Sequence, residues 1–393
     1  MVNLEKNIYK KYKELQSAVE CTTLAIFVRY LEKIYICEDG INIKVCDFEK
    51  YNQDNNQKFI QNICIKSKTN VVAIMNNNNL ANVKNLGKIP LMLDDFSEVF
   101  GGEVLFVDNA KKALKQIKRR RAVLLEDKGV IIRARSLDEA VTMIKILDKN
   151  AFILSKVNFF IQLSKTVSFL ENYVFTKYYS AENQKRQWEL ETLETINNEN
   201  DKNNQNNEEI VDENIKMVLE IAKKIYSSNS TQGTWGNVAV KIDDKTLYCT
   251  PKGIGYNLIT AKDIIKMDYT TRKQLSAGVA TSEKGIHCRI QNEYKEAKIS
   301  IHAHPTYGSI FAARNQTLEV ISEKGKELLG EKVYCSKHAL PMTKKLTDNT
   351  VDNLRGGKAV FMGNHGITVW GKDIKEVFEV LDVLEEECRL QNS

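Results

Sequence analysis

The chain has 393 residues, of which 42% are hydrophobic and 27% charged, and its formal net charge is +6. This length and composition predict two globular domains with sizeable cores. The positive excess is small and spread along the chain, so it favours an anionic small molecule and argues against nucleic acid as a partner.

Targeting and redox signals are absent from the sequence patterns. The eight cysteines show no CxxC spacing, which indicates reduced thiols rather than a disulfide framework. The opening residues "MVNLEKNIYKKYKELQ" contain no apolar signal segment, and no apolar run is long enough to cross a bilayer. We therefore expect a cytoplasmic protein with no membrane partner.

One segment of the N-terminal half has a clear secondary-structure pattern. The basic run "KRRR" at 118–121 directly precedes the apolar "AVLL", which favours a solvated helix end over a nucleic-acid patch. From Arg121, "RAVLLEDKGVIIRARSLDEAVTMIKILDKNAFI" predicts a strand, a tight turn at Gly129, a second strand and an amphipathic helix capped by Ser136.

A polar segment, Glu194–Asn214, divides the chain into halves of nearly equal length. It consists almost entirely of Asn, Glu and Asp and cannot bury a core, so we expect an exposed linker or loop. The predicted organisation is a domain at 1–190, a linker at 191–214 and a second domain at 215–393.

Two glycine turns and a helix start open the second half. "QGTWGNVAVKI" places Gly236 and Asn237 in a turn before a strand, where backbone N–H groups together with the Asn237 side chain can cradle a phosphate. "YCTPKGIGY" gives a second glycine turn. "ATSEKGIHC" then begins a helix with Ser282 as its cap, Glu283 in the first turn and His287 one turn further on.

Histidines are scarce, five in all, and two of them form the pair "HAH" at His302 and His304. On a strand these side chains share one face, as two ligands of a metal ion would. A pair of partly buried, hydrogen-bonded histidines is the alternative. "GNHGITVWG" adds His365 at a strand–strand turn, and three imidazoles with one carboxylate suit zinc or a related divalent ion.

The two halves look related. "KAVFMGNHGITVWGKDIKEVFEVLDVLEEECRL" from Lys358 matches the unit from Arg121 without gaps, with Gly366 and the cap Asp373 in the places of Gly129 and Ser136. Convergence of two ordinary hairpin–helix units is possible, but duplication explains the agreement better. "NVVAIMNNNNLA" aligns more loosely with "KISIHAHPTYGS", and Lys128 stands at the place of His365. The N-terminal half is therefore predicted to be a catalytically silent copy.

These motifs resemble, in order and spacing, the class II aldolase/adducin family. The family patterns GTSGN, TPSG and SSE correspond to 233–237, 250–253 and 281–283, and HxH and NHG correspond to 302–304 and 364–366. The resemblance covers about 215 to 388. It implies an α/β fold of two α/β/α domains, each with a mainly antiparallel central sheet flanked by helices, the first of them degenerate.

The resemblance also implies residue roles. Glu283 would be the catalytic acid/base and a fourth metal ligand beside His302, His304 and His365. The predicted phosphate and substrate site comprises Gly236, Asn237, Lys252, Gly253, Thr281 and Ser282.

Several positions depart from the family pattern or have no clear counterpart. Trp235 replaces a small residue, and Lys252 replaces a small hydroxyl residue, either to add charge to phosphate binding or merely to face solvent. Tyr307 and Tyr334 are candidates for the family's catalytic tyrosine, with a core or rim position as the alternative. His287 is expected to orient Glu283 or to satisfy the helix end rather than to bind metal, and His338 is expected to lie on the surface without a role.

The predicted function is a zinc-dependent sugar-phosphate aldolase that cleaves a ketose phosphate to dihydroxyacetone phosphate and an aldehyde. A 4-epimerase with the same retro-aldol step is the nearest alternative; by resemblance, such epimerases carry Asp at the position of Glu283. A dehydratase and a non-catalytic, adducin-like interaction protein are further alternatives. The resemblance implies a homo-oligomer, either a tetramer or a dimer that forms a pseudo-tetramer.

Overall fold

The structure is a computed structural model that describes residues 2–180, 212–256 and 258–392. Two compact units are present. Among the described residues, the N-terminal unit comprises 2–91, 95–156 and 164–175, and the C-terminal unit comprises 92–94, 157–163, 176–180, 212–256 and 258–392. Most of the predicted linker lies outside the described residues, and its last two residues begin a helix capped by Asp212.

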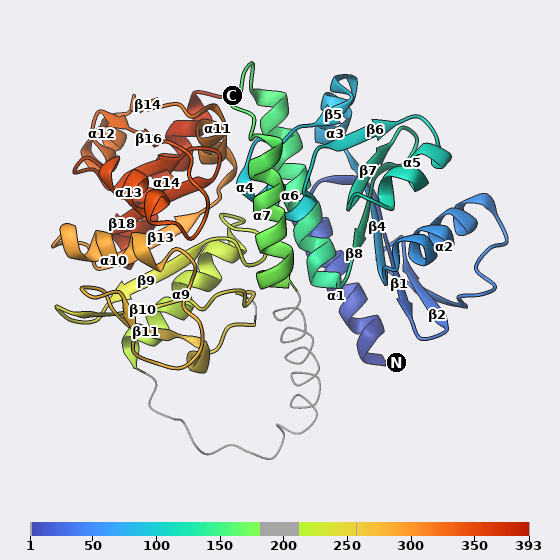
Figure 1. The fold of residues 1–393 in the computed structure, drawn as a ribbon, viewed down its shortest axis with the longest axis horizontal. Helices are drawn as coiled ribbons and strands as arrows, with labels where there is room; N and C mark the ends of the chain where they lie inside the picture. Colours follow the sequence, from blue (N-terminus) through green and yellow to red (C-terminus); the bar gives the residue numbers. More distant parts are fainter. Residues whose placement is uncertain (1, 181–211, 257, 393) are drawn as a thin grey trace, which may run out of the picture. The chain divides into compact units, whose positions relative to one another are not determined.

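The N-terminal unit is built on one mainly antiparallel sheet (Figure 1). Its strands are β1 (Cys21–Tyr30), β2 (Lys33–Cys37), β3 (Ile43–Asp47), β4 (Val71–Asn77), β5 (Lys88–Ile89), β6 (Val104–Val107), β7 (Ala122–Leu125) and β8 (Gly129–Ala134). Its helical segments are α1 (Val2–Ala18), α2 (Asn55–Ser67), α3 (Asn78–Val83), η1 (Lys84–Leu86), α5 (Ala110–Ile117), α6 (Leu137–Lys156) and α7 (Lys165–Val174). Helix α4 (Asp94–Phe100) begins at the last of the three residues, 92–94, that belong to the C-terminal unit.

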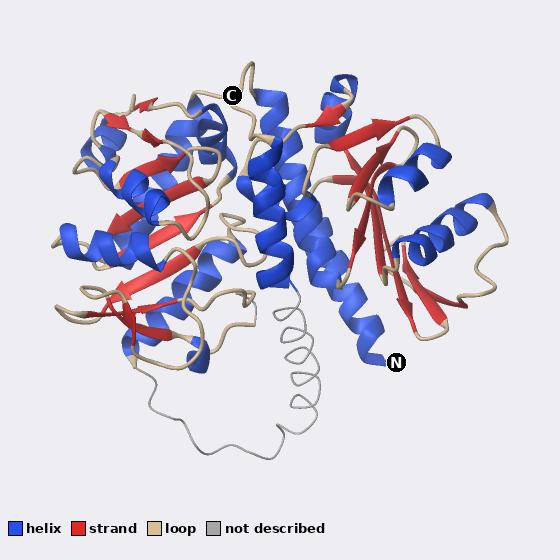
Figure 2. Ribbon diagram, in the orientation of Figure 1, coloured by secondary structure: helices blue, strands red, loops and turns tan. Residues whose placement is uncertain are grey.

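The C-terminal unit has a second sheet of the same kind (Figure 2). Its strands are β9 (Asn237–Lys241), β10 (Thr246–Cys249), β11 (Ile265–Asp268), β12 (Lys273–Gln274), β13 (Ile299–Ala303), β16 (Cys335–Ser336), β17 (Ala359–Met362) and β18 (Gly366–Gly371), with a separate ribbon of β14 (Leu318–Glu319) and β15 (Lys332–Val333). Its helical segments are η2 (Phe175–Ser180), α9 (Glu213–Ser227), η3 (Ala261–Asp263), α10 (Lys284–Glu293), α11 (Thr306–Arg314), α12 (Glu323–Leu329), α13 (Lys344–Asp352) and α14 (Ile374–Leu390).

The two sheets have the same strand order. The order β3-β2-β1-β4-β8-β7-β6 in the first corresponds to β11-β10-β9-β13-β18-β17-β16 in the second. In each of these series a single pair is parallel, β6 with β7 and β16 with β17. The shared order and the shared exception confirm the predicted α/β fold of two similar domains.

The hairpin glycines are equivalent in detail. A side chain at Gly129 would lie 2.4 Å from the carbonyl oxygen of Met75, and one at Gly366 would lie 2.5 Å from that of Ala303. Met75 pairs with the residue after Gly129, and Ala303 pairs with the residue after Gly366. Both turns therefore need glycine for the same close approach of backbone.

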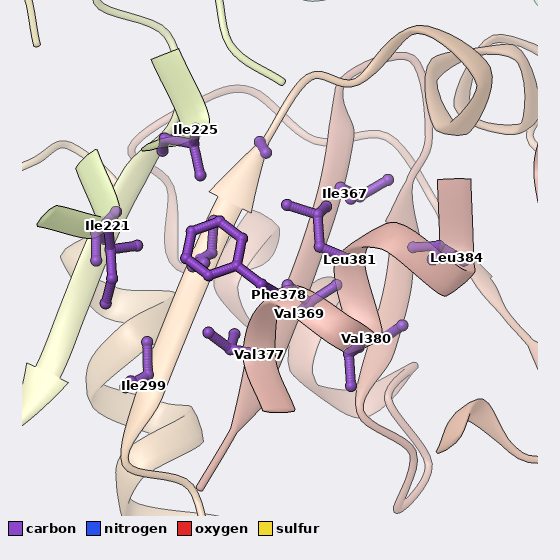
Figure 3. Packing of buried hydrophobic residues seen from close by; sticks show 14 of the residues in the cluster. Ile221, Ile225, Ile299, Ile367, Val369, Val377, Phe378, Val380, Leu381 and Leu384 are labelled. Carbon is purple, nitrogen blue, oxygen red and sulfur yellow. The ribbon is translucent and has the colours of Figure 1, made fainter. Parts of the chain in front are cut away.

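Alternating side chains place a core on each face of the C-terminal sheet. On β17, Phe361 packs with α14 and α9 on one face, while Val360 and Met362 pack with α10 and α13 on the other. Figure 3 shows Phe378 and Leu381 of α14 packed over β13 and β18. Helices on both faces give the predicted three-layer arrangement.

Two of the three predicted caps are observed; the third, Ser282, is wrong, because the N-cap of α10 is the next residue, Glu283. The Ser136 hydroxyl accepts from the backbone of Glu139 at 3.1 Å, and the Asp373 carboxylate accepts from the backbone of Glu376 at 2.8 Å. Among the described residues, no helix is both long enough and apolar enough to span a membrane.

Candidate metal centre

Three histidines meet at one end of the C-terminal sheet. His302 lies on β13, His304 directly follows that strand, and His365 precedes β18 in the turn from β17. The Nε2 atom of His302 lies 2.8 Å from Nε2 of His304 and 3.2 Å from Nε2 of His365. All three side chains are buried, at 4% exposure or less. The structure therefore brings the predicted imidazoles together.

Glu283 joins this cluster from the start of α10. Its Oε1 lies 3.0 Å from Nε2 of His365, and its Oε2 lies 3.2 Å from Nε2 of His302. The residue is the N-cap of α10 and is 5% exposed. Glu283 thus faces the same point as the histidines.

The arrangement of protons leaves lone pairs directed into the cluster. Nδ1 of His302 lies 2.8 Å from the carbonyl oxygen of Ile367, which can only accept, so this nitrogen carries the proton. Burial lowers the pKa of His302 well below its usual value, despite the opposing charge of Glu283, and the ring is neutral. The Nε2 lone pair of His302 then points into the cluster, where a positive charge makes its contacts favourable.

The donor set fits a small divalent ion. Tetrahedral zinc with nitrogen ligands at about 2.0–2.1 Å separates those nitrogens by about 3.3 Å, close to the 3.2 Å between His302 and His365. Imidazoles with one carboxylate match zinc and related transition metals better than calcium or magnesium, which prefer oxygen.

The charges of the cluster are strongly coupled. Burial alone would raise the pKa of the Glu283 carboxyl, but His302 and His365 hold it well below its usual range. Burial would lower the pKa of His365, yet Glu283 and Asp94 together hold it well above its usual value. Without a metal ion, a proton on His365 balances the two carboxylates.

A buried chain of hydrogen bonds fixes the orientation of Glu283. The Asn237 amide donates through Nδ2 to Oε2 of Glu283 at 3.0 Å, and its Oδ1 lies 2.6 Å from Nε2 of His287. Nδ1 of His287 lies 2.7 Å from the Ser300 hydroxyl. Burial lowers the pKa of His287 to about 4, so the ring is neutral, donates through Nε2 and accepts through Nδ1. His287 acts on Glu283 through Asn237.

The segments predicted to bind phosphate lie beside one another. The backbone N–H of Thr281 donates to the carbonyl of Thr250 at 3.1 Å, and that of Lys252 donates to the carbonyl of Val279 at 2.9 Å. The Thr250 hydroxyl accepts from the backbone of Val238 at 3.2 Å, next to the first glycine turn. These bonds bring together all six predicted positions: Gly236, Asn237, Lys252, Gly253, Thr281 and Ser282.

The Asn237 side chain, however, is committed to Glu283 and His287. The Lys252 ammonium lies 3.9 Å from the sulfur of Met342, and the residue is partly exposed.

Neither tyrosine candidate joins the cluster in the described structure. Tyr307 lies at the start of α11 and packs against the core beneath α14. The ring of Tyr334 lies under the guanidinium of Arg355, 4.1 Å from its centre. Both positions agree with the core or rim alternative.

His338 corrects one prediction. It was expected on the surface without a role, but its side chain is only 19% exposed, and its Nε2 lies 2.9 Å from Oδ1 of Asp94. The other oxygen of Asp94 lies 2.6 Å from Nδ1 of His365. Asp94 was absent from the predicted site because no local motif marks it.

Residues 216–392 match the family profile described as "Class II Aldolase and Adducin N-terminal domain". This part of the chain is therefore similar to the class II aldolase and adducin family. The matched residues include the whole histidine cluster and Glu283.

The names of the individual relatives describe different activities. The L-fuculose phosphate aldolase of Methanocaldococcus jannaschii is 29% identical over 175 residues, which cover 44% of this chain and 93% of that protein. A methylthioribulose-1-phosphate dehydratase of Klebsiella pneumoniae is 25% identical over 174 residues, covering 40% and 85%. A solved L-fuculose 1-phosphate aldolase is similar with a TM-score of 0.43 and 25% identity, covering 45% of this chain and 83% of that one.

Proposed function

We propose that the C-terminal unit is a metal-dependent lyase that cleaves a phosphorylated ketose by a retro-aldol reaction, giving dihydroxyacetone phosphate and an aldehyde. The observation that carries this proposal is the convergence of three imidazoles and the Glu283 carboxylate on one buried point. The names of the relatives, which concern sugar phosphates, support the substrate class.

The metal is proposed to be zinc or a related divalent ion, held by His302, His304 and His365, with Glu283 as a further ligand. Bound there, the ion would supply Lewis-acid polarisation of a substrate carbonyl. Neutral imidazole ligands leave most of its charge available for that task.

Glu283 is proposed as the group that moves the proton. Its carboxylate is ionised, since the neighbouring histidines hold its pKa well below the usual range, and it can accept the proton of the substrate hydroxyl. As that proton leaves, the oxygen forms the aldehyde carbonyl and the carbon–carbon bond breaks. The electron pair of that bond passes to the carbonyl of the other fragment, and the protonated Glu283 then returns its proton to carbon.

Positioning is assigned to the surrounding polar groups. The chain from Ser300 through His287 and Asn237 holds the carboxylate of Glu283 in one orientation. The adjoining loops around Gly236, Lys252 and Thr281 are proposed to hold the phosphate, whose atoms do not react and which therefore fixes the substrate in place.

The decisive experiment compares two capping carboxylates. Glu283→Gln is expected to retain metal and lose turnover by at least about 100-fold, the lower range for general acid–base catalysis. Asp54→Asn is the matched control, because Asp54 caps α2, the corresponding helix of the N-terminal unit. The assay offers ketose 1-phosphates and pentulose 5-phosphates and measures released triose phosphate.

Each alternative has its own outcome in this assay. An isomerised pentulose phosphate without release of triose would establish the epimerase, and loss of water from the substrate would establish a dehydratase. Wild-type protein that binds no divalent metal would overturn the lyase and favour an interaction protein. Full activity in Glu283→Gln would overturn the role of that residue.

The assembly is proposed to be a homo-oligomer, as in the family it resembles. Sedimentation at equilibrium is expected to give a mass of at least two chains, and a single-chain mass would contradict this proposal.

A further inference from the structure

Asp94 is a buried carboxylate that the proposed reaction does not use. Its side chain is 1% exposed, and each of its oxygens faces an imidazole: Oδ2 lies 2.6 Å from Nδ1 of His365, and Oδ1 lies 2.9 Å from Nε2 of His338. It stands 271 positions before His365 in the sequence, yet it is grouped with the C-terminal unit.

The bond to Asp94 decides which nitrogen of His365 is available. A carboxylate oxygen accepts a proton, so Nδ1 of His365 is the donor and carries the hydrogen. In a neutral ring this leaves the lone pair on Nε2, which faces His302 at 3.2 Å. Asp94 therefore selects the tautomer in which His365 points its free nitrogen into the cluster.

Asn364, next to His365, fastens the segment that carries Asp94. Its Nδ2 donates to the carbonyl of Met92 at 2.9 Å and to the carbonyl of Ile161 at 2.5 Å. The backbone carbonyl of Asn364 accepts from the backbone N–H of Asp94 at 2.7 Å. Asn364 adopts a left-handed backbone with φ 58°, which turns its carbonyl and side chain toward this segment. The turn that presents His365 thus also places its carboxylate partner.

Two of the predicted histidine ligands, His302 and His365, differ in the group that accepts the hydrogen bond from Nδ1. His302 donates to a neutral backbone carbonyl, that of Ile367, whereas His365 donates to a charged group. A carboxylate partner makes an imidazole a stronger electron donor, and changes in such outer partners typically alter metal affinity by about 10–100-fold. Asp94 is expected to have the largest effect among residues that do not touch the metal.

We propose that Asp94 is a positioning residue for the metal site, holding His365 through Nδ1, and that His338 holds the second oxygen of Asp94. The site in the C-terminal unit then depends on a residue from the N-terminal half of the sequence. This inference rests on the metal site of the proposed function but not on the reaction assigned to it.

The test is zinc affinity of the full-length protein, measured by competition with a chelating dye. Asp94→Ala is expected to weaken zinc binding by about 10–100-fold. Asp94→Asn keeps an accepting oxygen for His365 and should weaken binding less, and His338→Gln should weaken it least. Asp148→Asn is the matched control, because Asp148 is a mostly buried carboxylate of the N-terminal unit that accepts from Asn77 and Asn79.

A purely structural role for Asp94 would lower the melting temperature of the metal-free protein without this graded loss of affinity. The absorption spectrum of the cobalt-substituted protein gives a second readout, since a misoriented His365 changes the ligand field. If Asp94→Ala fails to fold, the Asp94→Asn and His338→Gln variants still measure the effect.

The outcomes separate this inference from the proposed function. Equal zinc affinity in wild type and all three variants would overturn the role of Asp94. Zinc binding with the graded loss but without aldol cleavage would overturn the proposed reaction and support the role of Asp94. Wild-type protein without zinc affinity would overturn both.

Discussion

The two sheets of this protein share a strand order but differ at the positions that matter for chemistry. The ladder register places Ile74 where the second sheet has His302, and Ala25 opposite it where the second sheet has Asn237. Asn76 occupies the place of His304, and Lys128, directly before the equivalent glycine, the place of His365. The corresponding face of the first sheet therefore lacks the histidines found in the second sheet.

The side chains on that face of the first sheet are apolar. Ala25, Phe27 and Val72 form part of an apolar cluster with helices α2 and α5, and Ile74 packs against it. In the second sheet the equivalent face carries Ser300 and His302, with Asn237 opposite. A buried polar network must be satisfied completely or replaced completely, since each unpaired member is costly. The comparison indicates that a domain can exchange one solution for the other while its opposite core face is maintained.

The largest expected effect is a loss of zinc affinity when a histidine of the second sheet is replaced, compared with no loss at the equivalent position of the first sheet. His304→Ala removes one of the proposed metal ligands and should weaken zinc binding by at least about 100-fold, the upper range for outer partners. Asn76→Ala, at the equivalent position, should leave zinc affinity unchanged. Dye competition measures both, and equal zinc affinity of the two variants would break the distinction between the sheets.

The helix that follows each hairpin should contribute equally to its own unit. Leu147 on α6 and Leu384 on α14 are both fully buried at matched positions. Replacement of either by Ala is expected to cost about 2–5 kcal/mol of stability, through lost burial and a residual cavity. Calorimetry can follow the two units as separate transitions, and a cost near zero at either site would show that the cores are not equivalent.

Exchanging residues at the same register should harm both sheets. Asn237→Ala removes one buried hydrogen-bond partner from Glu283 and one from His287, and Ala25→Asn places an amide in an apolar cluster. Each substitution is expected to cost about 1–3 kcal/mol. The midpoint of denaturant unfolding checks this, and a neutral Ala25→Asn would mean that the first sheet still accommodates polar groups.

The smallest effect is expected at exposed ion pairs, where the units should not differ. Lys84 and Glu126 in the first unit lie 2.9 Å apart, and Lys324 and Glu379 in the second lie 2.8 Å apart. Both pairs are largely solvated and screened by salt. Glu126→Gln and Glu379→Gln should each leave the melting temperature unchanged at physiological ionic strength; a clear shift in one would reveal an electrostatic difference between the units.

Much of the fold could be predicted because its signals are local. Core periodicity, helix caps and hairpin glycines recur within about thirty residues in each half, and the observed register agrees with the alignment of Ile74 to His302. The histidine cluster was also readable, since HxH on a strand and a histidine in a turn are local patterns. The proposed link from His287 to Glu283 proved to run through Asn237, a detail that spacing does not encode.

Asp94 shows what sequence reasoning could not reach. It follows an apolar run and precedes a second aspartate, Asp95, whose partner is Lys149 in the N-terminal unit. Nothing in the local sequence distinguishes the two carboxylates. The position of Asp94 follows from the tertiary hydrogen bonds made by Asn364 and His365. In that position Asp94 also contacts His338.

The chain passes into the C-terminal unit at 92–94 and again at 157–163 before it forms the main part of that unit. No single cut can therefore release that unit intact. A shortened gene beginning near position 215 would omit both Asp94 and the carbonyls that receive the Asn364 amide. The path of the polypeptide thus makes the C-terminal unit dependent on two segments from the first half of the sequence.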